Sequence, residues 1–167
     1  PVLEKREHGK FADLWWAFSR PQNLNQFEQK RIVTPEISLG CNMTIAEEGI
    51  YHTTKVYSFV FKETQENMYY WLGLLNSSIL WFFLSNTGYV LRGGYFTFKT
   101  NYLKPFPVKR IDWNNPKEVE LYSKVVQLVD NILSLRKGLT KDVLSNEKRE
   151  LTSNQISSME KEINNIF

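Results

Sequence analysis

The stretch YYWLGLLNSSILWFFLSNTGYVLRGG, residues 69–94, contains the most apolar part of the chain and ends on an Arg-Gly-Gly triplet. Its apolar portion covers residues 68–84, and this length of 17 residues lies at the lower limit for a membrane span. The polar triplet Asn-Ser-Ser interrupts it, and no cluster of Lys or Arg flanks one side only. A segment that is apolar on every side belongs inside a domain. We therefore predict no membrane association and two short buried helices, with Ser77 or Ser78 capping the second.

The composition of the whole chain is typical of a globular protein. Hydrophobic residues make up 42% and charged residues 23%, which excludes an intrinsically disordered chain. The one cysteine, Cys41, excludes an internal disulfide and a cysteine-rich zinc site. We expect a cytoplasmic protein, because neither a disulfide framework nor a signal peptide is present. The chain begins at Pro1 rather than Met and stops within a helical pattern, so we expect a fragment of a longer protein.

The hydrophobic patterns divide the chain into two regions. Alternating and β-branched residues predict strands at 30–37, 54–62 and 94–100. Together with an amphipathic helix at 11–19 and the two buried helices, these strands form a β-rich lobe over residues 11–110. The fold class is therefore predicted as α+β.

A C-terminal helical hairpin is predicted over residues 115–167. Asn115 suits the N-cap of a first helix, which has apolar residues at spacings of three and four and is expected to end at Gly138. A second helix is expected to begin near Thr152, where Gln155 completes a capping box. Because each helix carries one apolar stripe, we expect the two to pack as an antiparallel pair.

Basic residues gather in a part of the chain that lacks acids. No Asp or Glu occurs between Glu66 and Asp112. The same stretch contains five basic residues, namely Arg92, Lys99, Lys104, Lys109 and Arg110. A second basic group, Arg20, Lys30 and Arg31, lies just before or at the first predicted strand. Lys and Arg neutralise phosphates, so the pattern favours a surface for nucleic acid. The alternative is a solvated face without a ligand.

Patterns that would indicate catalysis are weak. Cys41 and His52 are imaginable as nucleophile and base, but their spacing specifies nothing, and a buried structural cysteine is the simpler interpretation. The acids are scattered, which leaves no candidate pair of carboxylates for acid–base chemistry. We therefore predict no catalytic residue, metal site or cofactor site within this chain.

Four segments together resemble a known family. They are KRIVTPEIS (30–38), YWLGLLNSSILWFFL (70–84), LRGGYFTFKTNYLKPFPV (91–108) and MEKEINNIF (159–167). In order and spacing they are similar to the TaqI-like C-terminal specificity domain. That domain is found at the end of adenine-specific DNA methyltransferases and of type IIG restriction–modification enzymes. The likeness extends from about Trp15 to the end of the chain.

The resemblance implies a target recognition domain that reads one sequence of double-stranded DNA. In the family, this domain faces an N-terminal methyltransferase domain, which holds S-adenosylmethionine and an Asn-Pro-Pro-Tyr/Phe motif for a flipped adenine. The motif is absent here, since residues 114–117 are a helix start. The resemblance thus implies that residues 1–10 are a linker from a missing catalytic domain. The parent protein is expected to be a site-specific adenine DNA methyltransferase; whether it also cleaves DNA stays open.

Sequence-specific binding needs cations that hold phosphates and side chains that read bases. For phosphate contacts the expected residues are Lys30, Arg31, Lys99, Lys104 and Lys109. For base reading the expected residues are Arg20, Arg92 and Tyr95. A rival interpretation makes the chain a protein-interaction module that acts through its C-terminal helices, similar to a piece of a type I specificity subunit.

Overall fold

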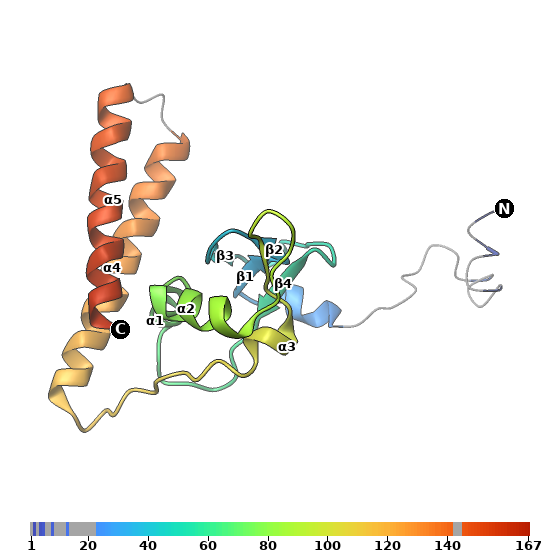
Figure 1. Ribbon diagram of the computed structural model, residues 1–167, viewed down its shortest axis with the longest axis horizontal. Helices are drawn as coiled ribbons and strands as arrows, with labels where there is room; N and C mark the ends of the chain where they lie inside the picture. The colour runs from blue at the N-terminus through green and yellow to red at the C-terminus, as the bar shows by residue number, and fades with distance from the viewer. Residues whose placement is uncertain (1, 3, 6–7, 9–12, 14–22, 142–144) are drawn as a thin grey trace.

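The computed structural model describes residues 2, 4–5, 8, 13, 23–141 and 145–167 (Figure 1). Almost all of the helix expected at 11–19, and the side chain of Arg20, lie outside these residues. The described part combines small antiparallel sheets with helices, and this confirms the predicted α+β class.

Two small antiparallel sheets meet after the first strand. In one sheet, β1 (Arg31–Pro35) lies between β3 (Thr44–Ala46) and β4 (Val56–Phe59). In the other, β2 (Ile37–Ser38) pairs with β5 (Phe96–Thr97). All three predicted strand regions therefore contain strands. No strand was predicted at β3, because three residues are too few to display an alternating pattern.

The apolar stretch forms the two helices that its sequence predicts. They are α1 (Met68–Leu75) and α2 (Ser78–Thr87). Six of the eight residues of α1 are buried, whereas only Leu80 and Leu84 are buried in α2. The stretch is thus core on one side of its joint and half-exposed helix on the other. Among the described residues, no helix is both long enough and apolar enough to cross a membrane.

The polar joint between these helices consists of side chains that satisfy backbone groups. The side chain of Asn76 accepts a hydrogen bond from the Met43 N–H over 2.9 Å and donates to the Met43 carbonyl over 3.1 Å. Ser77 does not cap α2 with its side chain, because its hydroxyl donates to the Leu74 carbonyl over 2.7 Å. The N–H of Ser78 is instead bound by Asn164 Oδ1 over 2.7 Å. A buried backbone group needs such a partner, so the joint is fixed from both sides.

The C-terminal region is a helical hairpin, as predicted, but its helices are longer than expected. The hairpin consists of α4 (Pro116–Lys141) and α5 (Asn146–Ile166), which lie side by side and antiparallel (Figure 1). Gly138 does not end α4, and α5 does not begin near Thr152; both expectations were wrong. Gly138 stays in the helix, and the side chain of Ser145 caps α5 by accepting from the Lys148 N–H over 3.4 Å.

Helix α1 holds the hairpin against the lobe. At Gly73, α1 and α4 pack closely against each other. A Cβ built on Gly73 would lie 2.9 Å from Cγ1 of Val125 and 3.2 Å from Cγ2 of Val129, both on α4. Tyr70 packs its ring on Tyr122 and donates its hydroxyl to the Lys109 carbonyl over 3.0 Å. Burial raises the pKa of Tyr70 to about 12, so this hydroxyl remains a donor.

A second link between the lobe and the hairpin is the segment after α3 (Thr100–Leu103), which leads into α4. Its Arg110 forms an ion pair with Glu66, with Nε 2.8 Å from Oε1. The Glu66 side chain is 1% exposed and also accepts from the Thr64 hydroxyl and the Ile111 N–H. Burial alone would raise the pKa of Glu66, but the hydrogen bonds from Arg110, Thr64 and backbone N–H groups lower it to about 2.

Replacing Gly73 by alanine should loosen the contact between α1 and α4. The new methyl group would overlap Val125 and force a shift, so the free energy of unfolding should fall by about 1–3 kcal/mol. Gly138→Ala is the matched control, because a Cβ there meets no atom within 4 Å. It should stabilise α4 by about 0.5–1 kcal/mol. Urea unfolding measures both, and equal effects of the two substitutions would contradict the packing.

The Glu66 cluster should make stability fall in acid. The pKa of Glu66 is lower in the folded chain than in the unfolded chain. The ionised Glu66 therefore contributes roughly 3 kcal/mol to the free energy of unfolding. This contribution is complete above about pH 4.5 and is lost as the pH falls toward 2. Unfolding free energies measured across this pH range should fall less steeply for Glu66→Gln than for the natural chain. Parallel curves for the two proteins would show that Glu66 is not stabilised as an anion.

Candidate nucleic-acid interface

The Arg-Gly-Gly triplet forms the tip of a tight hairpin. The Leu91 N–H donates to the Tyr95 carbonyl over 2.7 Å, and the Gly94 N–H donates to the Leu91 carbonyl over 3.2 Å. Gly93 and Gly94 have φ values of 86° and 80°, a region that side chains disfavour. This turn leaves the exposed Arg92 at its tip.

The strand that follows this turn has one buried face and one face that is open at Tyr95 and Lys99 but closed at Thr97, which is 5% exposed. Phe96 and Phe98 are 9% and 0% exposed, and Phe96 packs on the ring of Trp81 in α2 with ring centroids 5.0 Å apart. Tyr95 and Lys99 alternate with these rings, and both are exposed. The strand therefore presents its polar and aromatic groups on the side away from α2.

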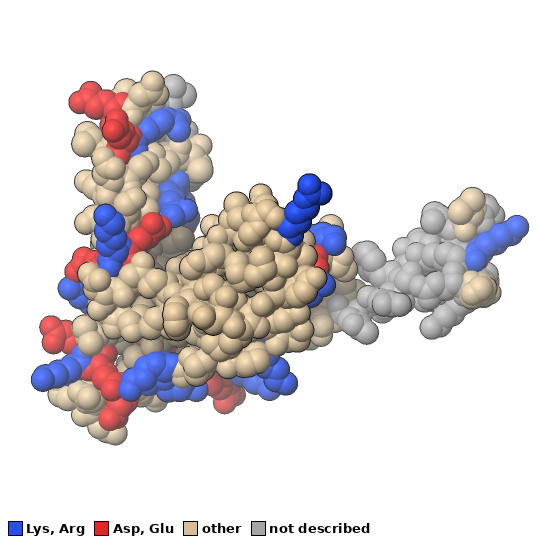
Figure 2. Space-filling model, in the orientation of Figure 1, with Lys and Arg blue, Asp and Glu red and all other residues tan. Residues whose placement is uncertain are grey.

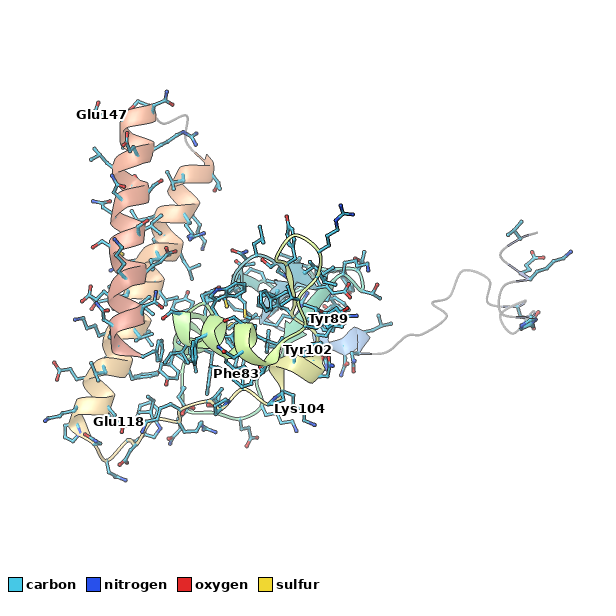
Figure 3. All side chains as sticks on the ribbon, in the orientation of Figure 1. Phe83, Tyr89, Tyr102, Lys104, Glu118 and Glu147 are labelled. Carbon is cyan, nitrogen blue, oxygen red and sulfur yellow. The ribbon has the colours of Figure 1, made fainter. Side chains whose placement is uncertain are left out.

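A cleft of about 360 Å³ lies on this open side. Its aliphatic floor includes Ile37 and Leu91. The other lining residues are Glu36, Tyr89, Thr97, Lys99, Asn101 and Tyr102. Figure 3 shows Tyr89 and Tyr102 close together at the α3 end of the lobe, with Lys104 below them. Aromatic rings beside amide, ammonium and carboxylate groups are the kinds of side chain that contact nucleobases and phosphates.

The basic residues of the lobe differ in whether they have a carboxylate partner. Lys99 lies 3.3 Å from Glu36. Arg92 and Lys104 are both exposed, and within the described ranges neither forms an ion pair. These two cations are consequently available to an outside anion.

Lys30 and Arg31 do not join this surface. Arg31 is 0% exposed, and its guanidinium donates to the carbonyls of Gln29 and Ile50 and stacks over the Phe27 ring at 4.9 Å. A phosphate has no access to a buried guanidinium, so the expected phosphate contact of Arg31 does not fit its position. Arg31 instead binds backbone carbonyls inside the lobe. Lys30 is exposed and pairs with Glu47 at 3.1 Å. It lies at the start of β1, whereas Glu36 follows the end of that strand, roughly 20 Å away.

Lys109 and Arg110 belong to the joint between the lobe and the hairpin. Lys109 pairs with Glu118 at 3.0 Å, and Arg110 pairs with Glu66. Hydrogen bonds from the Asp112 N–H and from Lys109 lower the pKa of Glu118. In Figure 3, Glu118 lies near the foot of the hairpin, whereas Lys104 lies under the lobe, on the other side of the picture.

The acid-free run is thus free of acids only along the sequence. Folding brings Glu36, Glu66 and Glu118 from outside the run onto three of its five cations. Figure 2 shows a face on which the lobe is mostly uncharged, with basic groups and fewer acidic groups along its edges, while both signs of charge occur along the hairpin. The residues expected to contact DNA therefore fall into two groups. Those within residues 92–104 are exposed, although Lys99 pairs with Glu36, whereas Arg31 and Lys109 bind partners that hold the fold together.

Four cleft residues were missed by reasoning from the sequence. They are Glu36, Tyr89, Asn101 and Tyr102. Glu36 was hidden because an acid beside a predicted strand gives no signal for DNA contact. Tyr89 lies outside the four family-like segments. Asn101 and Tyr102 lie within the segment 91–108, but they are common residue types that no pattern singled out.

The imagined pair of Cys41 and His52 is not formed. The Nε2 atom of His52 lies 2.6 Å from Ser58 Oγ, and burial raises the pKa of the Cys41 thiol to about 12. A thiol with such a pKa is not a nucleophile at neutral pH. Cys41 instead lines a cleft of about 470 Å³ between the lobe and the hairpin, whose one acid, Glu160, pairs with Arg136 at 2.7 Å.

Comparison with known proteins places this geometry in a family. The chain is 29% identical over 140 residues to the type II methyltransferase M.HindII of Haemophilus influenzae, a match that covers 80% of this chain and 27% of that protein. It is also 29% identical over 140 residues to the type II methyltransferase M.HincII of the same species, with 80% and 28% covered. The chain therefore spans about a quarter of the length of the curated relatives it matches. The model of the TaqI-like C-terminal specificity domain matches residues 4–108, which include both sheets, α1, α2 and the Arg-Gly-Gly turn. Because this match covers more than half of the chain, the protein belongs to the TaqI-like C-terminal specificity domain family.

Proposed function

We propose that this chain reads a specific sequence of double-stranded DNA on behalf of a DNA methyltransferase of a restriction–modification system. The observation that supports this most strongly is the family match over residues 4–108. The two relatives, both named type II methyltransferases, support the same role. Within the matched region, the turn carries the exposed Arg92 and Tyr95, and the cleft supplies Lys99, two tyrosine rings and the Asn101 amide.

In this proposal, Lys99 and Lys104 hold phosphates and set the register of the domain on the duplex. Arg92 and Tyr95, at and beside the tip of the turn, read bases, since a guanidinium forks onto the O6 and N7 atoms of guanine. Arg20, outside the described residues, remains a proposed base reader. Lys30 is a peripheral phosphate contact. Arg31 is left out because it is buried, and Lys109 because it pairs with Glu118 at the joint between the lobe and the hairpin.

The whole enzyme is proposed to be a site-specific adenine DNA methyltransferase that acts in the cytoplasm. Its methyl donor would be S-adenosylmethionine, which supplies the methyl group to the target base. The chain spans about a quarter of the length of its two methyltransferase relatives, so the larger part of such a protein is available to hold the methyl donor. We therefore assign the cofactor to an N-terminal methyltransferase domain of the longer protein.

The same longer protein offers a role for the hairpin. The outer ends of α4 and α5 extend well beyond the lobe (Figure 1), and Leu151 on α5 is 59% exposed. We propose that this end contacts the methyltransferase domain. In this arrangement the hairpin positions the lobe, and the lobe contacts the DNA.

Sequence selection from a random duplex library should give a motif for the full-length protein. The affinity for that motif should fall steeply as salt rises, because Lys and Arg release counterions from phosphates. Arg92→Ala should weaken binding to the motif by about 5- to 150-fold and binding to random duplex much less. Fluorescence anisotropy at several salt concentrations measures both affinities.

Lys137→Ala is the matched control for the loss of one exposed positive charge, since Lys137 lies on α4 of the hairpin. It should leave both affinities nearly unchanged. If no motif emerges, or if Lys137→Ala weakens binding while Arg92→Ala does not, the hairpin is the working surface and the rival interaction module is favoured. Equal losses on both duplexes for Arg92→Ala would make Arg92 a phosphate contact rather than a base reader.

A further inference from the structure

Glu36 stands at the corner where the two sheets meet. Its N–H donates to the Lys55 carbonyl over 2.8 Å on the side of β4, and its carbonyl accepts from the Phe98 N–H over 2.8 Å on the side of β5. The N–H and the carbonyl of Glu36 are thus each bound by a strand of a different sheet, or by a residue beside it. A side chain on so fixed a backbone has a defined position, which recognition of a single chemical group requires.

The carboxylate of Glu36 lines the cleft and is bound by two ammonium groups. Lys55 lies 3.1 Å from Oε2, and Lys99 lies 3.3 Å from Oε1. The hydrogen bond from Lys55 is the main cause that lowers the pKa of Glu36, so the group stays an anion at neutral pH. Two cations and one anion leave a net charge of +1, and this cluster would not be repelled by the phosphates of a duplex.

An ionised carboxylate accepts hydrogen bonds and donates none. Each of its oxygens has two lone-pair sites, and the ion pairs with Lys55 and Lys99 use one on each oxygen. The group therefore has capacity for a further donor in the cleft. In the major groove, the donors on base edges are the exocyclic amino groups of cytosine and adenine, whereas guanine and thymine present acceptors.

We propose that the cleft of Glu36, Tyr89, Lys99, Asn101 and Tyr102 reads one base pair, with Glu36 accepting a hydrogen bond from the exocyclic amino group of a cytosine or adenine. Tyr89 and Tyr102 line the cleft beside it, and the ammonium of Lys99, the proposed phosphate contact, lies next to the carboxylate. The inference rests on the proposed DNA-reading function and adds a specificity residue that the motif around Arg92 does not include.

The test compares the motif selected by the full-length natural protein with the motif selected by Glu36→Gln. The amide has nearly the same shape but carries donors as well as an acceptor. If the position of the motif that Glu36 reads is occupied by cytosine, it should lose its preference over guanine and thymine by at least about fivefold, while the other positions keep theirs. If it is occupied by adenine, the variant should keep adenine and reject cytosine at least about fivefold more strongly, because a glutamine amide bonds to both N6 and N7 of adenine. The matched control is Glu48→Gln, which makes the same exchange at an exposed carboxylate outside the cleft and should leave the motif unchanged.

A change on the DNA side makes the test independent of any folding defect of the variant. N4-methylcytosine or N6-methyladenine, placed at that position of the motif, keeps base pairing but removes one donor and adds bulk. The natural protein should bind the modified duplex at least about fivefold more weakly. Modification of the other cytosines and adenines of the motif, the methylated target adenine excepted, should weaken binding less.

The outcomes separate this inference from the proposed function. If the natural protein selects no motif, the proposed function fails. If it selects a motif that Glu36→Gln leaves unchanged, and the methylated duplexes bind as the unmodified duplex does, then Glu36 only holds the corner of the sheets. In that case the inference is wrong although the domain reads DNA.

Discussion

The close approach of α1 to α4 at Gly73 is the contact on which the rest of the structure depends. Helix α1 is buried on nearly all sides, so it belongs equally to the core of the lobe and to that of the hairpin. Polar contacts reinforce this packing, because Tyr122 of α4 accepts from the Asn67 N–H before α1, and Asn164 of α5 accepts from the first N–H of α2. Since unpaired backbone donors at helix starts are costly, these bonds fix the lobe on the hairpin.

This arrangement determines which surface of the lobe stays open. With α1 and α2 covering one side of the strands, the Arg-Gly-Gly turn and the cleft beside it face outward. The domain therefore separates its two tasks in space: apolar packing on one side gives rigidity, and polar groups on the other side remain free for a ligand. Such rigid support is what precise recognition requires.

Reasoning from the sequence succeeded where one local pattern decides the structure. The two helices in the apolar stretch, the strands at residues 30–37 and 94–100, and the hairpin all follow from periodicity and length. Helix ends were harder to predict, because α4 continues through Gly138 and α5 begins at Asn146, after the Ser145 cap, rather than near Thr152. Glycine is tolerated in a long packed helix, and an upstream serine cap is enough to start one.

Part of the candidate site could also be predicted from the sequence and part could not, but for a different physical reason. A run without acids predicts a basic surface only if no acid approaches from elsewhere, and the sequence does not show which acids approach. Glu36, Glu66 and Glu118 do so, while Arg31 is drawn inside by backbone carbonyls. Arg92 was identifiable because a glycine pair after an arginine indicates an exposed turn. The cleft beside it depends on pairing between β2 and β5, in which Ser38 pairs with Phe96, 58 positions further along the chain. No local pattern reveals such pairing.

The central claim is that the open side of residues 89–104, and not the hairpin, contacts DNA. Hydrogen–deuterium exchange of the full-length protein, with and without the duplex selected from a library, tests it most directly. The account predicts that DNA slows exchange of backbone amides in residues 89–104 and leaves α5 unchanged. Slower exchange along α5, with no change in residues 89–104, would contradict it.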